Sequence, residues 1–252
     1  MLVAEGDWMT PELTTLAVLC ILFVATLSRF TLGFGDALVG MPLLLLILSK
    51  DAASPLIALV ILTVAGIMLA AEWRNVHFQS AWRLVVPGLA GIFLGLHFLQ
   101  RANEQLVNGV LGVVVILFAG YSLIGPRQFE LKSENSAVVF GFLAGLMGGA
   151  YNTHAPPLVI YGTLRRWTVE RFRATLQGYF LPAGVVVVAG HGWAGRLSGD
   201  VIGYYLLSLP VIGITWFVGK RLNGRFETKS FIRLVHWILI AVGAALLVKA
   251  VS

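Results

Sequence analysis

The sequence predicts an all-α integral membrane protein made of two pseudo-repeated halves in inverted topology. Each half is expected to begin with a broken or hairpin helical segment, and eight to ten membrane segments are expected in total. The 252 residues are 58% hydrophobic and 12% charged, whereas about 25% of residues are charged in soluble domains. The mean hydropathy is +0.87. Glycine-rich interruptions also divide two long apolar stretches at related places, as in many transporters.

Ten apolar segments follow one another along the chain. They cover residues 13–32, 37–49, 55–71, 84–99, 106–124, 137–151, 156–164, 174–190, 201–219 and 231–251. A spanning helix needs about 20 residues, so the 37 residues of 13–49 are too many for one span and are expected to fold back. The stretch 137–164 is divided in the same way, although one tilted, broken helix could hold it.

This segmentation divides the chain into two membrane repeats within one integral domain. Residues 1–124 form the first repeat, with a hairpin at 13–49 and three helices. Residues 125–252 form the second, with a hairpin at 137–164 and three helices. Each repeat then holds an odd number of membrane segments, so the second repeat enters the membrane from the opposite side.

The distribution of basic residues favours the two-hairpin layout, because Lys and Arg prefer the cytoplasmic side of a membrane. With both termini outside, 13 basic residues fall in cytoplasmic loops and four, Lys50, Arg101, Arg196 and Lys249, fall outside, with Arg29 undecided. If each divided stretch crosses only once, the split is 11 to 6. We therefore expect both termini to lie outside the plasma membrane, which is the inner membrane in a bacterium.

The two divided stretches align at an offset of 115, which matches Gly33 to Gly148 and Pro42 to Pro157. Unpaired backbone at membrane depth persists only where protein or a water-filled cavity surrounds it. Glycine allows a solute to approach the backbone closely, and a helix N-terminus after such a break favours an anion. Close helix packing by small residues is the alternative explanation for each of these glycines.

The segment GFGDALVGMPLLLLI at 33–47 resembles the first signature of the sulfite exporter TauE/SafE family, and GFLAGLMGGAYNTHAPPLVIY at 141–161 resembles its second. The resemblance implies a multi-pass transporter of small sulfur-containing or related organic anions, with both broken segments meeting at the substrate path. This chain departs from the family pattern at Asp36, where glycine is frequent. Asn152, Thr153 and His154 replace part of the second glycine-rich turn.

Three ionisable residues near the interruptions are the main polar candidates. Asp36 and His154 are candidates for proton coupling, because ionisable groups at membrane depth are expensive and often mark proton pathways. Alternatively, Asp36 caps the helix that starts at Ala37, and His154 is a neutral imidazole hydrogen-bonded to backbone. Arg29 could bind a substrate anion, but it could also snorkel to the cytoplasmic interface or pair with Asp36.

We expect the two interruptions to converge from opposite sides on one substrate cavity. For Gln177, hydrogen bonding to a neighbouring helix is the alternative to a place in that cavity. The predicted substrate-binding residues are Gly33, Gly35, Asp36, Pro42, Gly148, Gly149, Asn152, His154, Pro156, Pro157 and Gln177.

These features favour a secondary transporter, with an anion channel or uniporter as the alternative. The chain has no HExxH or GxSxG signature of an intramembrane enzyme, and no GxxxxGK[ST] loop of an ATP-driven pump. The single cysteine, Cys20, excludes an intramolecular disulfide, and no metal or cofactor is expected. The expected partners are a small anion and membrane lipid, whereas the basic excess reports cytoplasmic loops and not nucleic-acid binding.

Overall fold

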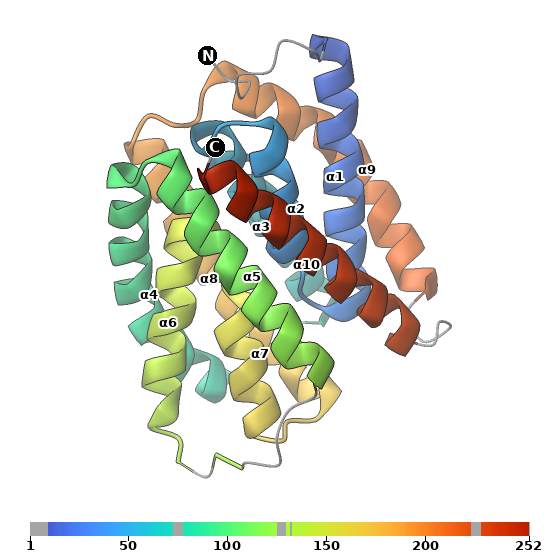
Figure 1. Ribbon diagram of the computed structural model, residues 1–252. Coiled ribbons are helices and arrows are strands. Elements are labelled where there is room, and N and C mark those ends of the chain that lie inside the picture. The colour runs from blue at the N-terminus through green and yellow to red at the C-terminus, as the bar shows by residue number, and fades with distance from the viewer. Residues whose placement is uncertain (1–9, 73–77, 125–129, 132, 223–227, 252) are drawn as a thin grey trace. The chain divides into compact units, whose positions relative to one another are not determined.

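A computed structural model describes residues 10–72, 78–124, 130–131, 133–222 and 228–251, and these residues form ten helices (Figure 1). The all-helical prediction is confirmed, and each predicted apolar segment lies in one helix, except that residues 48 and 49 follow the end of α2. Several helices extend beyond the apolar segments into polar flanks. The helices are α1 (Pro11–Leu32), α2 (Asp36–Ile47), α3 (Lys50–Glu72), α4 (Phe78–Arg101), α5 (Glu104–Ile124), α6 (Ser136–Tyr151), α7 (Ala155–Leu164), α8 (Val169–Trp193), α9 (Gly199–Leu222) and α10 (Thr228–Val251).

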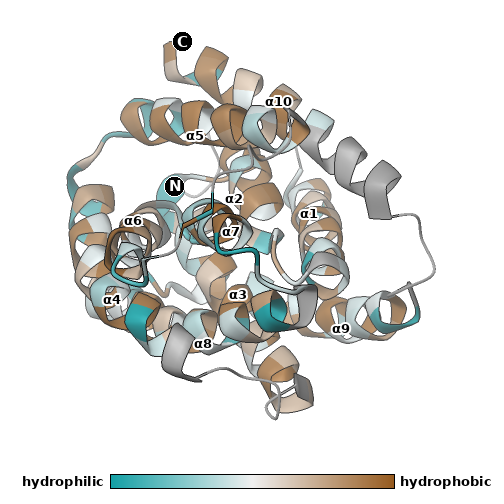
Figure 2. Ribbon diagram, turned by 90° about the horizontal axis from the view of Figure 1, so that it is seen from below, coloured by the Kyte–Doolittle hydropathy of each residue, from teal (hydrophilic) through white to brown (hydrophobic). Residues whose placement is uncertain are grey.

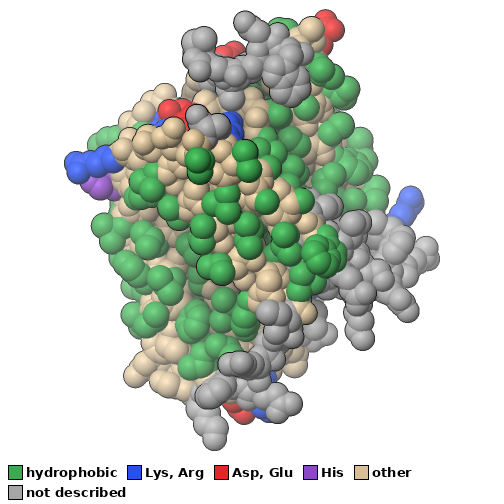
Figure 3. Space-filling model, in the orientation of Figure 1, with side chains coloured by type: hydrophobic (Ala, Val, Ile, Leu, Met, Phe, Trp, Pro, Cys, Tyr) green, Lys and Arg blue, Asp and Glu red, His purple; other side chains and the backbone are tan. Residues whose placement is uncertain are grey.

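Six of the described helices, namely α1, α3, α4, α5, α8 and α9, are long and apolar enough to cross a membrane. Their outward faces carry large hydrophobic side chains such as Phe93, Leu117 and Phe217, each more than 60% exposed. Hydrophobic residues occur on the coloured parts of the labelled helices in Figure 2, and on the face shown in Figure 3 the charged side chains lie mainly at the margins. This surface is typical of helices in contact with lipid tails.

The chain divides into two compact units, each of which takes segments from both predicted repeats, and the boundary at residues 60 and 61 falls within α3. Unit 1 comprises residues 1–60, 102–124 and 195–252, and unit 2 comprises residues 61–101 and 125–194. In unit 1, α1 packs on α9, and in unit 2, α6 packs on α4. The first helix of each predicted repeat therefore packs on the fourth helix of the other.

Unit 1 is held together mainly by the pairs α1–α9 and α5–α10. The hydroxyls of Thr26 on α1 and Thr215 on α9 are hydrogen-bonded at 3.0 Å, and both side chains are buried. One turn further along both helices, Gly219 lies against Phe30. Because the two contacts advance in the same direction, α1 and α9 run parallel, and their first residues lie at the same end of unit 1.

Unit 2 is built around a backbone contact between the parallel helices α4 and α6, which lie side by side in Figure 1. Glycines 141, 145 and 149 recur every four residues on α6, and a Cβ at any of them would overlap a backbone carbonyl of α4. Small residues allow helices to approach this closely in membranes. The close-packing explanation is therefore confirmed for Gly145 and Gly149.

Three polar contacts join residues at or near helix ends. In unit 1, Nε of Arg196 lies 3.3 Å from Oδ1 of Asp51, and Nζ of Lys249 donates to the Leu45 carbonyl at 2.6 Å. In unit 2, Nη2 of Arg165 lies 3.5 Å from Oε1 of Glu134. Single crossings by 13–49 and 137–164 would separate the members of all three pairs by the hydrocarbon thickness of about 30 Å. The two-hairpin layout, which would place both members of each pair on one side of the membrane, stays a prediction.

Candidate functional site

The first helix break joins α1 to α2 in unit 1. The chain leaves α1 through Gly33, at φ 85°, and enters α2 through Gly35, at φ 113°. These backbone conformations strain any residue with a side chain. The 12 residues of α2 rise about 18 Å, less than the thickness of a bilayer core, so α2 is too short to cross a membrane alone.

Arg29 and Asp36 form a buried ion pair across this break. Nη1 of Arg29 donates to both carboxylate oxygens of Asp36, at 3.0 and 3.1 Å, and the arginine side chain has no exposed surface. Oδ1 of Asp36 also accepts the N–H of Ala37 at 3.0 Å. The expected pairing is confirmed, and the snorkelling alternative is wrong. The capping alternative needs a correction of one residue, because Asp36 is the first residue of α2 and Gly35 precedes the helix.

The second break joins α6 to α7 in unit 2. Asn152 ends α6 in the left-handed region, at φ 57°, a conformation that asparagine tolerates better than most residues, and its N–H donates to the Gly148 carbonyl at 2.8 Å. Asn152 and the two residues after it are buried. The ten residues of α7 rise about 15 Å, so α7 is also too short to cross a membrane alone.

Pro156 and Pro157 lie in the first turn of α7 and are buried. Proline has no backbone N–H, so the first turn of α7 offers fewer donors to an anion than an ordinary helix N-terminus. The first turn contains no acidic residue, and the positive end of the helix dipole therefore remains unopposed there.

The imidazole of His154 folds back onto α6. Its Nδ1 lies 3.1 Å from the Ala144 carbonyl, and since a carbonyl only accepts, Nδ1 carries the proton of this hydrogen bond. A Cβ at Gly148 would overlap the ring. The ring also makes edge contacts with Tyr179 and Phe180 of α8, at centroid distances of 5.5 and 5.9 Å. The predicted alternative of an imidazole hydrogen-bonded to backbone is thus confirmed, and Gly148 makes room for it.

The two breaks align at a different offset from the one that sequence identity suggested. The left-handed residues 33 and 152 differ by 119, and so do the first residues of α2 and α7, 36 and 155. The offset of 115 is therefore wrong by one helical turn. Gly148 lies inside α6 and matches position 29 at this offset, while Pro42 lies inside α2 and Pro157 in the first turn of α7.

The remaining predicted residues have different surroundings. Gly149 packs against the Ile92 carbonyl of α4, so its lack of a side chain is explained by helix packing and not by an approaching solute. Pro42 is buried in α2, and Gln177 is fully buried in α8. Tyr179, two residues beyond Gln177, was not predicted. Its contact with His154 spans 25 residues and has no local sequence signal.

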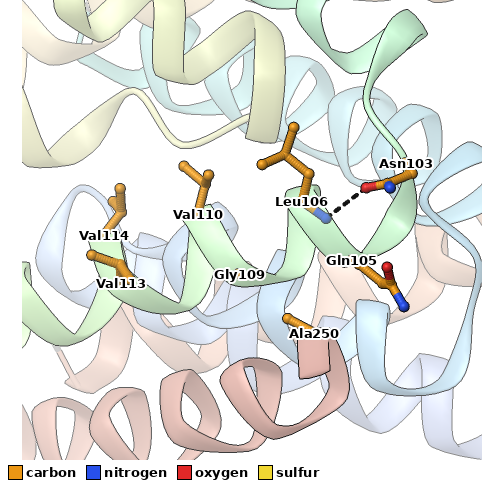
Figure 4. Close-up of a pocket in the computed structure, with 8 residues that line it drawn as sticks. All are labelled: Asn103, Gln105, Leu106, Gly109, Val110, Val113, Val114 and Ala250. Carbon is orange, nitrogen blue, oxygen red and sulfur yellow. Dashed lines mark hydrogen bonds between the residues drawn. The ribbon is translucent and has the colours of Figure 1, made fainter. Parts of the chain in front are cut away.

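The structure also contains an open groove of about 520 Å³ on α5, far from the predicted residues in sequence (Figure 4). Half of its eight lining residues are valine or leucine, with Asn103 and Gln105 near one end and Ala250 of α10 beside them. None of the predicted site residues lines it. Among the described residues, no cluster of histidine, cysteine and acidic side chains could hold a metal ion.

Comparison with known proteins identifies the family. The family model named sulfite exporter TauE/SafE matches residues 17–246, which includes both helix breaks. The chain belongs to the sulfite exporter TauE/SafE family. The resemblance seen in the two glycine-rich segments is thereby confirmed.

Two relatives of this TauE/SafE chain have names that describe a transport function. The probable sulfite/organosulfonate exporter TauE of Cupriavidus necator is 24% identical over 249 residues, which cover 95% of this chain and 96% of the relative. The probable membrane transporter protein YtnM of Bacillus subtilis is 26% identical over 122 residues, covering 43% of this chain and 41% of the relative. No solved structure matches the chain.

Proposed function

We propose that this chain is a secondary transporter that exports a small sulfur-containing oxyanion, sulfite or an organosulfonate, across the plasma membrane, with both termini outside. The observation that carries the proposal is the pair of helix breaks, each followed by a helix too short to cross a membrane alone. Each break contains buried polar residues. A solute path needs such polar groups, whereas non-helical backbone and polar side chains are unfavourable in contact with lipid alone. The family and the name of the Cupriavidus relative support the class of substrate.

Flux into proteoliposomes tests this proposal. The purified protein is reconstituted, and the efflux of trapped sulfite is compared with the efflux of taurine, sulfate and chloride, with protein-free vesicles as the control. A carrier gives sulfite efflux that saturates with concentration, and a channel gives efflux that does not. Efflux equal to that of protein-free vesicles for every sulfur anion would contradict the proposed function.

We further propose that protons are coupled to export through the groups at the two breaks, His154 and Asp36. Both are buried ionisable residues, and at membrane depth such groups are rare unless they serve a pathway. Sulfite efflux is measured with and without an imposed pH gradient. The gradient should accelerate efflux by the native chain and have a smaller effect on His154→Gln and on the double variant Arg29→Gln/Asp36→Asn, in which neither partner of the ion pair is charged. An equal response in the native chain and both variants would exclude this coupling.

A further inference from the structure

The two helix breaks differ in the charge that they contain. At the first break, the carboxylate of Asp36 already lies at the N-terminus of α2 and accepts hydrogen bonds from Ala37 and Arg29. An anion at this break would therefore face the negatively charged carboxylate of Asp36. At the second break, the first turn of α7 has no acidic residue, and the buried polar side chains are those of Asn152, Thr153 and His154.

A buried hydroxyl without a partner belongs to Tyr179 of α8, whose ring contacts His154 of the second break. The side chain of Tyr179 is 1% exposed, and among the described residues its hydroxyl has no hydrogen-bond partner. The hydroxyl lies over Gly88 of α4, at 2.6 Å from where a Cβ would be. An unsatisfied buried hydroxyl is unfavourable, so such groups in native proteins call for a ligand, an ion or a water.

A second tyrosine of unit 2 has an equally unpartnered hydroxyl but different surroundings. Tyr151 is buried at the end of α6, and its ring packs edge-on against Phe98 of α4 at 6.1 Å. Phe98 lies ten residues beyond Gly88 on α4, about 15 Å along the helix axis. Tyr151 therefore provides a matched control for Tyr179 within the same unit.

Resting on the proposed function, we propose that the exported oxyanion is bound at the second break, and that the hydroxyl of Tyr179 donates a hydrogen bond to it. The edge contact with His154 positions the tyrosine ring, and Gly88 leaves space for its hydroxyl. The N-terminus of α7 adds a favourable dipole, because no acidic residue in its first turn neutralises it. The first break, which holds its own ion pair, does not bind the substrate.

Tyr179→Phe tests this proposal, because it removes only the hydroxyl. Sulfite affinity, measured by calorimetry on the full chain in lipid nanodiscs, should fall about tenfold or more, as expected when a hydrogen bond to a charged group is lost. Without sulfite, the thermal unfolding temperature should stay the same or rise, since an unsatisfied polar group has been removed. A purely structural role for the hydroxyl would lower the unfolding temperature and leave the affinity unchanged.

Two control variants make the result specific. Tyr151→Phe makes the same chemical change at the second unpartnered hydroxyl and should leave sulfite affinity within about twofold of the native value. Ser28→Ala changes a buried hydroxyl beside Gly35 at the first break and should also leave it unchanged. A native affinity for Tyr179→Phe, or a tenfold loss for Ser28→Ala, would overturn the inference. Native protein without sulfite efflux would instead overturn the proposed function.

Discussion

The imidazole of His154 occupies the space that a side chain at Gly148 would take, and its Nδ1 donates to the carbonyl of Ala144 on the same helix. The loop of the second break is thus fastened to the helix that precedes it. At the first break, the guanidinium of Arg29 reaches forward to Asp36 on the helix that follows. The two breaks are therefore stabilised by different chemistry in opposite chain directions.

The first prediction concerns the fit of His154 on Gly148. Gly148→Ala should displace the imidazole, break its hydrogen bond to Ala144 and lower the stability of the protein by about 1–3 kcal/mol, a typical effect of overpacking. Thermal unfolding in a fixed detergent measures the change. The double variant Gly148→Ala/His154→Ala should recover much of the loss, because the clashing ring is gone. If the two changes simply add, the ring and the glycine do not interact.

The second prediction concerns the contact between α4 and α6. Gly145→Ala places a methyl group on the backbone carbonyl of Gly88, which cannot rotate away, so the variant should unfold at a lower temperature or fail to accumulate. Gly213→Ala in α9 is the matched control. It meets no neighbouring atom and should be neutral or slightly stabilising, as alanine is in helices. Equal unfolding temperatures for the two variants would argue against the backbone contact.

The third prediction concerns the buried ion pair. Asp36→Asn leaves the charge of Arg29 buried without its carboxylate, which should lower stability by about 3–5 kcal/mol. The double variant Arg29→Gln/Asp36→Asn carries neither charge and should be more stable than Asp36→Asn alone. Unfolding of the two single variants and the double variant gives the coupling energy. A coupling near zero would contradict the ion pair.

The fourth prediction concerns topology. In a Cys20→Ser background, cysteines introduced at Asp51 and at Arg196 should react with a membrane-impermeant thiol reagent from the same side of the membrane, which the charge distribution predicts to be the outside. Cysteines at Glu134 and Arg165 should both react from the cytoplasmic side. Reagent added separately to the two sides of sealed vesicles gives the measurement. Labelling of 51 and 196 from opposite sides would contradict the two-hairpin layout.

The sequence predicted the helical segments and both breaks because hydropathy and glycine content are local properties. The sequence aligned the two breaks with an error of one helical turn, because it matched Gly33 to Gly148. These two glycines have different structural roles. Gly33 turns the chain, whereas Gly148 accommodates a ring. The pairing of Arg29 with Asp36 was among the expected alternatives because only seven residues separate them. The contact of His154 with Tyr179 depends on how α8 packs, which no local pattern encodes.

The exchange of helices between the predicted repeats has a consequence for biosynthesis. The partner of α1 in the other predicted repeat is α9, which begins 167 residues after α1 ends, at 199 and 32 respectively. At about 5–20 residues per second, a ribosome needs roughly 8 to 33 seconds to make that stretch. The newly inserted α1 must therefore remain in the bilayer, or with an insertion factor, until most of the chain has been made. Premature termination after α5 would leave α1 without α9 and α4 without α6, so neither compact unit would be complete.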